Sequence, residues 1–170
     1  FDHGKGNVLD GKIFGKTEGH QAKVYNHHQH VRAAGFFDEN GDAQISEYLL
    51  KVGTNTTGLM EMRTPSTTSD VYNIGARIEV PDSTAIQFEA NILAYSMDGN
   101  KTASYQLRGI AINNTGSVFI RGNTKTELHE DDPAWDVLAA PGGNTLRFYG
   151  NSNGDDVRFM CKISTVEIKR

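Results

Sequence analysis

E-D-D-P-A-W-D-V-L-A-A-P-G-G-N-T-L-R-F-Y-G-N-S-N-G-D-D-V-R-F-M-C-K-I-S-T-V-E-I, residues 130–168, is the stretch that decides the fold. Three apolar runs in it are separated by two segments rich in glycine and asparagine, at 141–144 and 150–154. In the last run an apolar residue occupies every second position from Val157 to Ile163, which is the period of a strand with one buried face. The stretch therefore predicts three strands joined by two turns.

The chain before this stretch, from residue 45 onward, has the same character. Apolar residues alternate with polar ones most clearly between Ala85 and Tyr95, and Asp-Gly and Thr-Gly pairs at 97–100 and 113–116 predict hairpin turns. No segment has a helical period, so we expect an all-β head, an antiparallel, jelly-roll-like β-sandwich over residues 45–170. The remaining strands are expected at 45–52, 59–63, 76–80, 85–95, 102–112, 117–120 and 123–129.

Composition excludes several classes of protein. The net charge is −4 and no block of Lys or Arg occurs, which argues against a nucleic-acid partner. No apolar run approaches the roughly 20 residues of a membrane span. Cys161 is alone, so it cannot form a disulfide within the chain, and its place on the apolar side of a strand predicts a buried thiol. The chain begins at Phe1 without an initiator methionine, so we expect a fragment of a longer protein.

Residues 1–44 differ from the head because glycines divide them into short, weakly apolar pieces. Such a segment cannot bury a core alone. It suits a fibre shaft or trimerisation segment in which three chains bury one another's apolar residues. Residues 17–35 resemble the repeats of trimeric adhesin heads. The alternative is a flexible linker.

The sharpest chemical feature of this segment is His27-His28-Gln29-His30. On a strand, His28 and His30 point to one side. Three copies around a trimer axis would offer six imidazoles, enough for a transition-metal ion. The run is similar to the His-x-His devices of fibrous phage proteins. The alternative is a set of solvated loop histidines, and a zinc site within one chain lacks partners at the usual spacing.

Residues 38–46 begin like a calcium-binding loop, with Asp38, Asn40 and Asp42 at the first, third and fifth positions. Ala43 stands where that loop needs glycine, and Leu49 stands where it needs a bidentate carboxylate. We therefore expect a turn that leads into the strand at 45–52.

We find no catalytic signature and expect a protein that is not an enzyme. Glu130, Asp131 and Asp132 form a carboxylate cluster, but adjacent acids before a proline are typical of a solvated loop. A G-x-S-x-G elbow and a phosphate-binding glycine loop are both absent from the sequence. Trp135 is expected in the core.

The residues already quoted carry a family resemblance. The acidic run before A-W-D-V, then L-R-F-Y-G, then V-R-F-M-C-K-I-S-T-V-E-I resembles the terminal β-domain of bacteriophage tail fibres. Runs at 41–50, 78–91 and 105–109 follow the order expected of that family, so the resemblance covers residues 41–168. It implies a homotrimer in the virion tail fibre. Such a domain acts outside the host cell on surface glycan or lipopolysaccharide, beside other virion tail proteins. Two alternatives are a purely structural module that caps or trimerises the fibre, and a monomeric carbohydrate-binding module of a bacterial enzyme.

Host contacts are expected on loops, because loops vary freely while a sandwich holds them in place. The turns at 97–100, 113–116 and 150–155 offer amides and carboxylates for sugar hydroxyls, and tyrosines can stack on sugar rings. Tyr72 and Tyr105 are also expected to be exposed. The alternative is that the turns merely connect strands. The predicted receptor-binding residues are Tyr95, Asp98, Asn100, Asn113, Asn114, Tyr149, Asn151 and Asn153.

Overall fold

The computed structural model describes residues 2–5, 15–26, 28–64 and 77–170. These residues form twelve strands and no helix. The strands are β1 (Asp2–Lys5), β2 (Lys16–His20), β3 (His30–Ala34), β4 (Ala43–Thr54), β5 (Met60–Met62), β6 (Ile78–Glu79), β7 (Thr84–Ser96), β8 (Thr102–Asn113), β9 (Val118–Glu130), β10 (Asp136–Gly142), β11 (Thr145–Asn151) and β12 (Val157–Lys169).

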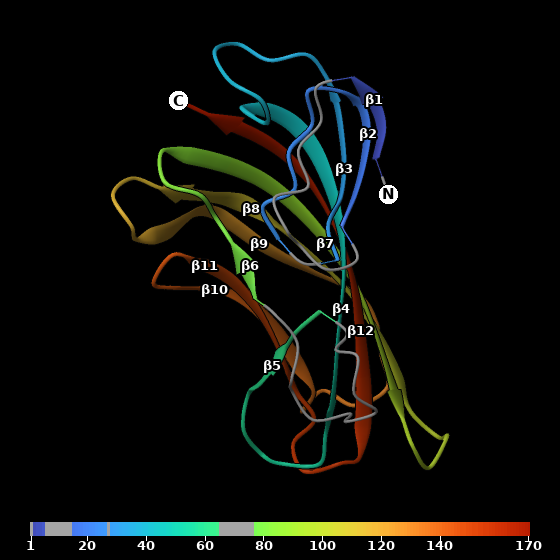
Figure 1. Ribbon diagram of the computed structural model, residues 1–170. Helices are drawn as coiled ribbons and strands as arrows, with labels where there is room; N and C mark the ends of the chain where they lie inside the picture. The colour runs from blue at the N-terminus through green and yellow to red at the C-terminus, as the bar shows by residue number, and fades with distance from the viewer. Residues whose placement is uncertain (1, 6–14, 27, 65–76) are drawn as a thin grey trace.

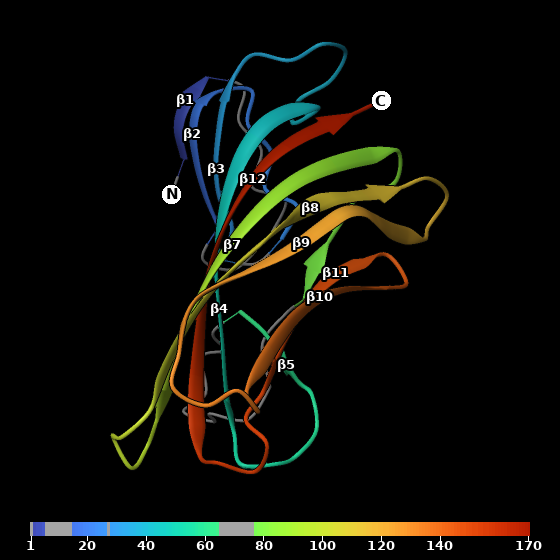
Figure 2. The same ribbon diagram turned by 180° about the vertical axis from the view of Figure 1, so that it is seen from behind.

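The strands form two sheets that face each other (Figures 1 and 2). The large sheet has the order β1-β2-β3-β4-β12-β7-β8-β9, and the small sheet has the order β10-β11-β5, with β6 also paired to β11. Pairing is antiparallel throughout, except that β1, β2 and β3 run parallel to one another. The predicted all-β fold with antiparallel sheets in a sandwich is confirmed.

Strand β12, predicted from the last apolar run, lies in the middle of the large sheet. It pairs over its length with β4 on one side and β7 on the other. Its alternate residues from Val157 to Ile163 are buried, as the period predicted. Because the last strand lies between two strands from the first half of the head, the sheet cannot be completed until the whole chain is available.

The prediction of two separate strands at 117–120 and 123–129 is wrong, because β9 is one strand. Its register against β8 shifts between Arg108 and Ile110, where β9 carries one extra residue. Gly122 lies there with φ +59°. A glycine takes this left-handed conformation at little cost, so the extra residue forms a bulge instead of ending the strand.

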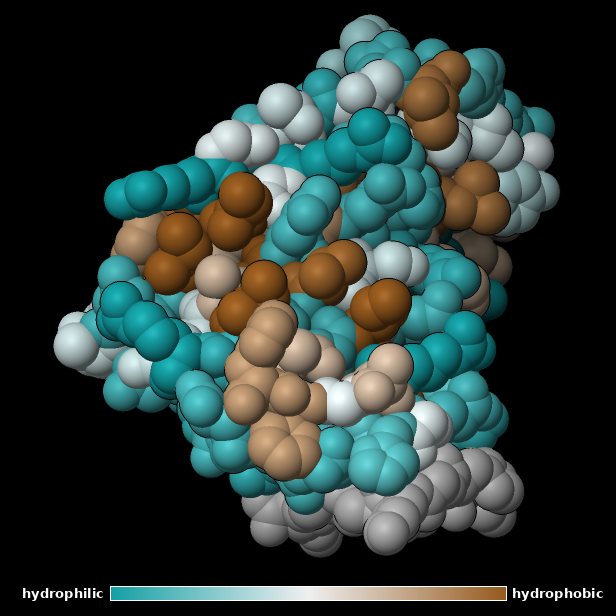
Figure 3. Space-filling view, turned by 90° about the horizontal axis from the view of Figure 1, so that it is seen from above, coloured by the Kyte–Doolittle hydropathy of each residue, from teal (hydrophilic) through white to brown (hydrophobic). Residues whose placement is uncertain are grey.

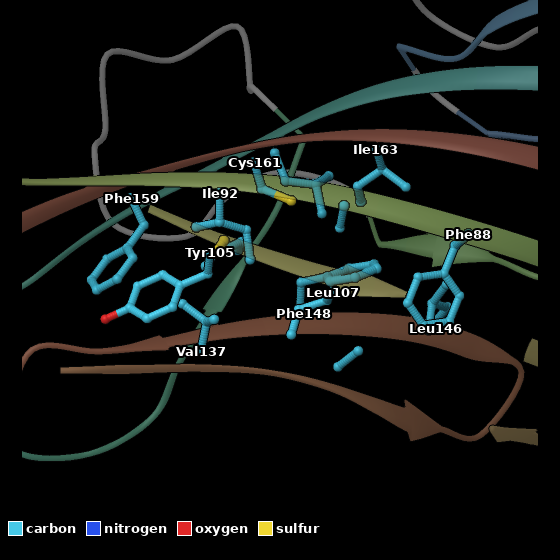
Figure 4. Close-up of a cluster of buried hydrophobic side chains, with 14 of the residues drawn as sticks. Phe88, Ile92, Tyr105, Leu107, Val137, Leu146, Phe148, Phe159, Cys161 and Ile163 are labelled. Atoms are coloured by element: carbon cyan, nitrogen blue, oxygen red, sulfur yellow. The ribbon is translucent and has the colours of Figure 1, made fainter. Parts of the chain in front are cut away.

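The core lies between the two sheets (Figure 4). Phe88 of the large sheet meets Phe148 of the small sheet edge to face at 5.5 Å between ring centroids. Trp135 is buried and packs against Phe159 at 6.5 Å, so the prediction of a core tryptophan is confirmed. Cys161 is also buried, and burial raises the pKa of its thiol.

The N-terminal segment extends the large sheet of the head. Strand β3 pairs with β4, and Gln29 fixes the approach to it. The Gln29 Nε2 atom donates to Ser46 Oγ at 2.7 Å, and its Oε1 accepts the amides of Tyr25 and Asn26 at 2.8 and 2.9 Å. A small apolar cluster of Ala22, Val24 and Val31 lies apart from the main core. Residues 16–20 and 30–34 are thus strands of this sheet, and the boundary at residue 44 and the trimerising role stay predictions.

The predicted turn at Asn40-Gly41-Asp42 is confirmed, and the strand it leads into, β4, begins at Ala43. The buried Asp42 carboxylate accepts hydrogen bonds from the amides of Phe37, Asp38 and Glu39 at 2.9, 2.5 and 2.9 Å. Burial opposes ionisation of Asp42, but hydrogen bonds from the amides of Asp38, Glu39 and Phe37 outweigh it and lower its pKa.

Candidate functional site

The structure separates the predicted receptor-binding residues into three groups. Five of them lie at one end, which we call the tip and define as the turns 97–100, 131–135 and 152–156. Asn113 and Asn114 lie at the other end of β8. Tyr149 lies on the small sheet, and His28 and His30 lie in the N-terminal segment. The five at the tip or beside it are Tyr95, Asp98, Asn100, Asn151 and Asn153.

The turns of the tip are joined by one lysine. The Lys101 Nζ atom lies 2.7 Å from Asp132 Oδ2 and 2.8 Å from Asp155 Oδ2. Trp135 Nε1 donates to the same Asp155 oxygen at 3.1 Å, and the Met97 amide donates to the Asp156 carbonyl at 2.8 Å. Three turns that are far apart in the sequence therefore form one hydrogen-bonded end of the molecule.

Electrostatics favour this arrangement. Hydrogen bonds to Asp132 and then to Asp155 raise the pKa of Lys101. The hydrogen bond from Lys101 is the largest cause that lowers the pKa of Asp132 and of Asp155. The Lys101 charge thus stabilises both carboxylates and offsets the repulsion between Asp132 and Asp155. Sequence reasoning missed Lys101, because its partners lie 31 and 54 residues away and no local pattern marks them.

Tyr95 is the aromatic residue that the tip exposes, with 49% of its surface accessible. It lies between Arg158 and Thr102 on the outer face of the sheet. Its hydroxyl lies over the turn, because a Cβ atom on Gly99 would be 3.2 Å from it. Gly99 has φ +77°, a left-handed conformation that glycine adopts at little cost, and a side chain there would also crowd the Tyr95 hydroxyl.

The polar residues beside Tyr95 stabilise their own turns and are also exposed to solvent. Asp98 Oδ1 accepts the Asn100 amide at 3.2 Å, and Asn151 Oδ1 accepts the Asn153 amide at 3.0 Å. Hydrogen bonds from the Ser96 hydroxyl and then from the Asn100 amide lower the pKa of Asp98. Asp98, Asn100 and Asn153 are exposed, so their remaining acceptors and donors are accessible to a ligand.

The predicted exposure of Tyr105 is wrong. Tyr105 is fully buried and its hydroxyl donates to Glu130. It belongs to the inward-facing set of β8, between Ala103 and Leu107, and the polar hydroxyl reaches the carboxylate at the edge of the core. Tyr149 is half-buried on the outer face of the small sheet, opposite Glu61. Tyr72 lies outside the described residues.

The Asn113 side chain makes hydrogen bonds within the fold. It is buried, its Nδ2 donates to the Val80 carbonyl at 2.7 Å, and its Oδ1 accepts the Gly116 amide at 2.9 Å. Asn114, the next residue, is exposed. Of this predicted pair, only Asn114 is exposed on the surface.

The prediction that His28 and His30 share one strand is wrong, because β3 begins at His30 and His28 lies in a turn with φ +56°. The His30 Nε2 atom is 3.3 Å from Glu18 Oε2, and its Nδ1 is 3.8 Å from Glu47 Oε2. Across the described part of the chain, no three His, Cys, Asp or Glu side chains converge on a point that could hold a metal ion. A metal on a trimer axis stays a prediction, and His27 lies outside the described residues.

The acidic run at 130–132 stabilises the loop in which it lies. Glu130 accepts the Tyr105 hydroxyl, Asp131 Oδ2 accepts the Thr102 amide at 2.8 Å, and Asp132 contacts Lys101. Each carboxylate thus has a partner within the fold.

Among the described residues there is no helix long and apolar enough to cross a membrane.

Comparisons with known proteins show a likeness in structure alone. No family model and no curated protein matches the chain. Among solved structures, it is similar to the tailspike protein gp49 from Acinetobacter baumannii bacteriophage Fri1, a capsular polysaccharide depolymerase. The identity is 12% and the TM-score is 0.42, over 94% of this chain and 28% of the tailspike chain. At this identity and TM-score, function has to be inferred from this chain's own residues.

Proposed function

We propose that this chain is a non-enzymatic distal domain of a phage tail fibre that attaches the virion to glycan on the host cell surface. The proposal is supported by the family resemblance of residues 41–168 and by one structural observation. Two of the three turns predicted to bind the receptor meet at the tip, beside the exposed ring of Tyr95.

The chemistry of the tip suits sugar. The face of an aromatic ring covers the apolar face of a sugar ring, and Tyr95 is placed to do so. Asp98, Asn100 and Asn153 supply acceptors and donors for hydroxyl groups. The Lys101 contacts hold the turns in place before binding, which reduces the entropy that a ligand has to overcome.

Assembly into a homotrimer belongs to the same proposal, because three weak sites on one rigid body bind a repetitive surface far better than one. Figure 3 shows hydrophobic residues gathered on the face seen from above, with hydrophilic residues around them. The large sheet exposes Ile45, Val166 and Ile168 at 51, 49 and 53% on β4 and β12, and Phe37 nearby at 71%. Single exposed apolar residues are ordinary, but a contiguous group marks a contact surface.

We assign this apolar face to a second copy of the chain. It includes a shallow groove of about 540 Å³, lined mainly by apolar atoms. The groove is bordered by Ala33 and Ala34, which belong to the segment predicted to trimerise. The segment and the groove are thus parts of one continuous surface.

Adsorption to host cells tests the binding function. Labelled wild-type protein should bind, and Tyr95→Ala should bind at least about tenfold less, since each lost aromatic contact costs about 0.5–1.5 kcal/mol and a trimer loses three. Leu128→Ala, which truncates an exposed residue on β9 outside the tip, is the matched control and should bind like wild type.

Three results would contradict the proposal in different ways. Absence of adsorption by wild type would favour a structural module that only caps the fibre. Release of sugar from the cell surface would show an enzyme. A stable monomer that binds purified polysaccharide would favour a carbohydrate-binding module of a bacterial enzyme.

A further inference from the structure

A second concave surface lies at the end of the domain opposite the tip. This polar hollow of about 300 Å³ is lined by Lys23, Tyr25, Glu79, Asp82, Asn113 and Asn144, among others. These residues come from the N-terminal segment, β6 and the loop after it, the end of β8 and the β10–β11 turn. Strand β8 separates the hollow from the tip by about 35 Å, at roughly 3.4 Å per residue.

The walls of the hollow are fixed by hydrogen bonds across these segments. Asp82 Oδ1 accepts the amides of Ser83, Thr115 and Gly116 at 3.0, 2.7 and 3.3 Å. Ser83 has φ +59° and Thr115 has φ +122°, which are unfavourable values for residues with a side chain. Strained residues persist only where several contacts impose them, and such positions concentrate at binding sites.

The N-terminal segment is attached to this wall by a pair of hydrogen bonds. Asn26 Nδ2 donates to the Glu79 carbonyl at 3.0 Å, and Asn26 Oδ1 accepts the Glu79 amide at 2.7 Å. The Val80 amide donates to the Asn144 carbonyl at 2.9 Å, which adds the β10–β11 turn. The hollow is therefore preformed from both the N-terminal segment and the head.

Several polar groups around the hollow have no partner within the described part of the chain. Lys23 Nζ lies 5.3 Å over the Tyr25 ring and forms no hydrogen bond or ion pair there. Asp82 Oδ2 also has no hydrogen bond or ion pair among the described residues, because all three amides bind Oδ1. The side chains of Glu79 and Asn144 likewise have none there. One ammonium, two carboxylates and one amide thus surround a space beside a half-buried phenol ring.

We propose that the polar hollow binds one neutral sugar unit, which makes it a second glycan site distinct from the tip. Its volume is at the small end of ligand pockets and suits a single ring. The Lys23 ammonium donates to hydroxyls, and the carboxylates of Glu79 and Asp82 accept from them. One positive and two negative side chains disfavour an acidic sugar. The ligand class rests on the proposed function, but the binding site does not involve the tip.

Titration of the full chain with D-glucose, D-galactose, N-acetyl-D-glucosamine and D-glucuronate, followed by NMR, tests this proposal. We expect at least one neutral sugar to bind in the millimolar range, more tightly than glucuronate. Lys23→Met and Asp82→Asn should each weaken it about tenfold, as expected for loss of a charged hydrogen bond. Asp82→Asn retains an oxygen for the three amides. Lys51→Met, an exposed lysine on the large sheet, is the control and should bind like wild type.

The outcomes separate this proposal from the function of the tip. Tyr95→Ala should retain the sugar affinity of the hollow while binding host cells more weakly than wild type. Failure of all three neutral sugars to bind at 50 mM, tighter binding of glucuronate, or unchanged affinity in both Lys23→Met and Asp82→Asn would each overturn it. If wild-type protein does not adsorb to host cells, that result contradicts only the proposed function.

Discussion

At the scale of single residues, buried or bridging carboxylates organise the loops of this protein. Asp42 binds three backbone amides in the loop before β4, and Asp82 binds three in the loops at the polar hollow. At the tip, Asp132 and Asp155 share one lysine. In each case a short acidic side chain satisfies donors that a loop would otherwise leave to solvent.

Replacing Asp42 with alanine should destabilise the protein by about 1–3 kcal/mol, because three backbone amides lose their buried, charged acceptor. Urea denaturation followed by fluorescence measures this change. Asp38→Ala removes an exposed carboxylate four positions earlier and should change the unfolding free energy by less than about 0.5 kcal/mol. Equal effects of the two substitutions would show that the Asp42 contacts contribute nothing specific.

Stability should also depend on pH through Asp42. Its pKa is lowered in the folded state, so its contribution is complete above the ordinary aspartate pKa of about 3.9 and is lost as pH falls through the lower folded value. In urea titrations from pH 5 to pH 2, wild type should lose more stability than Asp42→Asn. Parallel pH profiles would contradict the lowered pKa.

Lys101 is expected to control the mobility of the tip. Lys101→Met keeps the length of the side chain but removes both ion pairs, so the turns at 131–135 and 152–156 should open more often. Hydrogen exchange should accelerate in these turns and stay unchanged in β4. Lys51→Met is the matched control. If the tip turns exchange at the same rate in Lys101→Met as in Lys51→Met, packing alone holds the tip.

At the scale of elements, apolar and polar residues alternate along the strands because each sheet has one face against the core. Strand β12 has a buried residue at every second position from Val157 to Glu167, and β7 does so from Ile86 to Ala94. Strand β9 departs from this pattern, because it is the edge of the large sheet and is exposed over most of its length. Burial on one face, and not strand propensity alone, produces the period of two.

Phe148 tests how strongly the two sheets depend on each other. It is fully buried on β11 and meets Phe88 across the core. Phe148→Ala should cost about 3–5 kcal/mol in unfolding free energy. Leu128→Ala, on the exposed edge strand, should cost less than about 0.5 kcal/mol in the same denaturation experiment. A cost below about 1 kcal/mol for Phe148→Ala would mean that the small sheet is not packed as described.

At the scale of the whole molecule, the apolar outer face and the N-terminal segment predict assembly. Ile45 and Val166 are register partners on neighbouring strands, so substitutions there act on one patch. The double variant Ile45→Glu and Val166→Glu should shift a trimer to monomer, because burying two carboxylates in an apolar interface is costly. Light scattering over a range of protein concentrations measures the mass.

Leu128→Glu places the same charge on an exposed residue of β9 and should stay trimeric. Circular dichroism should show that all variants keep their strands, so that a change of mass reports assembly and not unfolding. Wild type that stays monomeric at every concentration would refute the homotrimer, and a double variant that stays trimeric would place the interface elsewhere.

The sequence by itself determined most strands of the head and the hairpin turns between them. Alternation and glycine-rich turns are local signals, since side chains point to opposite faces at successive positions and tight turns need particular residues. They were enough to predict the all-β class, the buried Cys161 and Trp135, and the hairpins at 97–100 and 113–116. They were not enough to choose the inward face of β8, so the buried Tyr105 was predicted to be exposed.

Only the tertiary structure decided which loops meet. The pairing of β12 with β4 joins residues more than a hundred positions apart, and the pairing of β12 with β7 places the Asp155 turn next to Lys101. The polar hollow likewise needs Lys23 and Asp82 to come together from separate segments. Register between distant strands is set by burial of the whole core, which no local pattern encodes. For this reason the composition of each loop could be read in the chain, while the candidate sites exist only in the folded molecule.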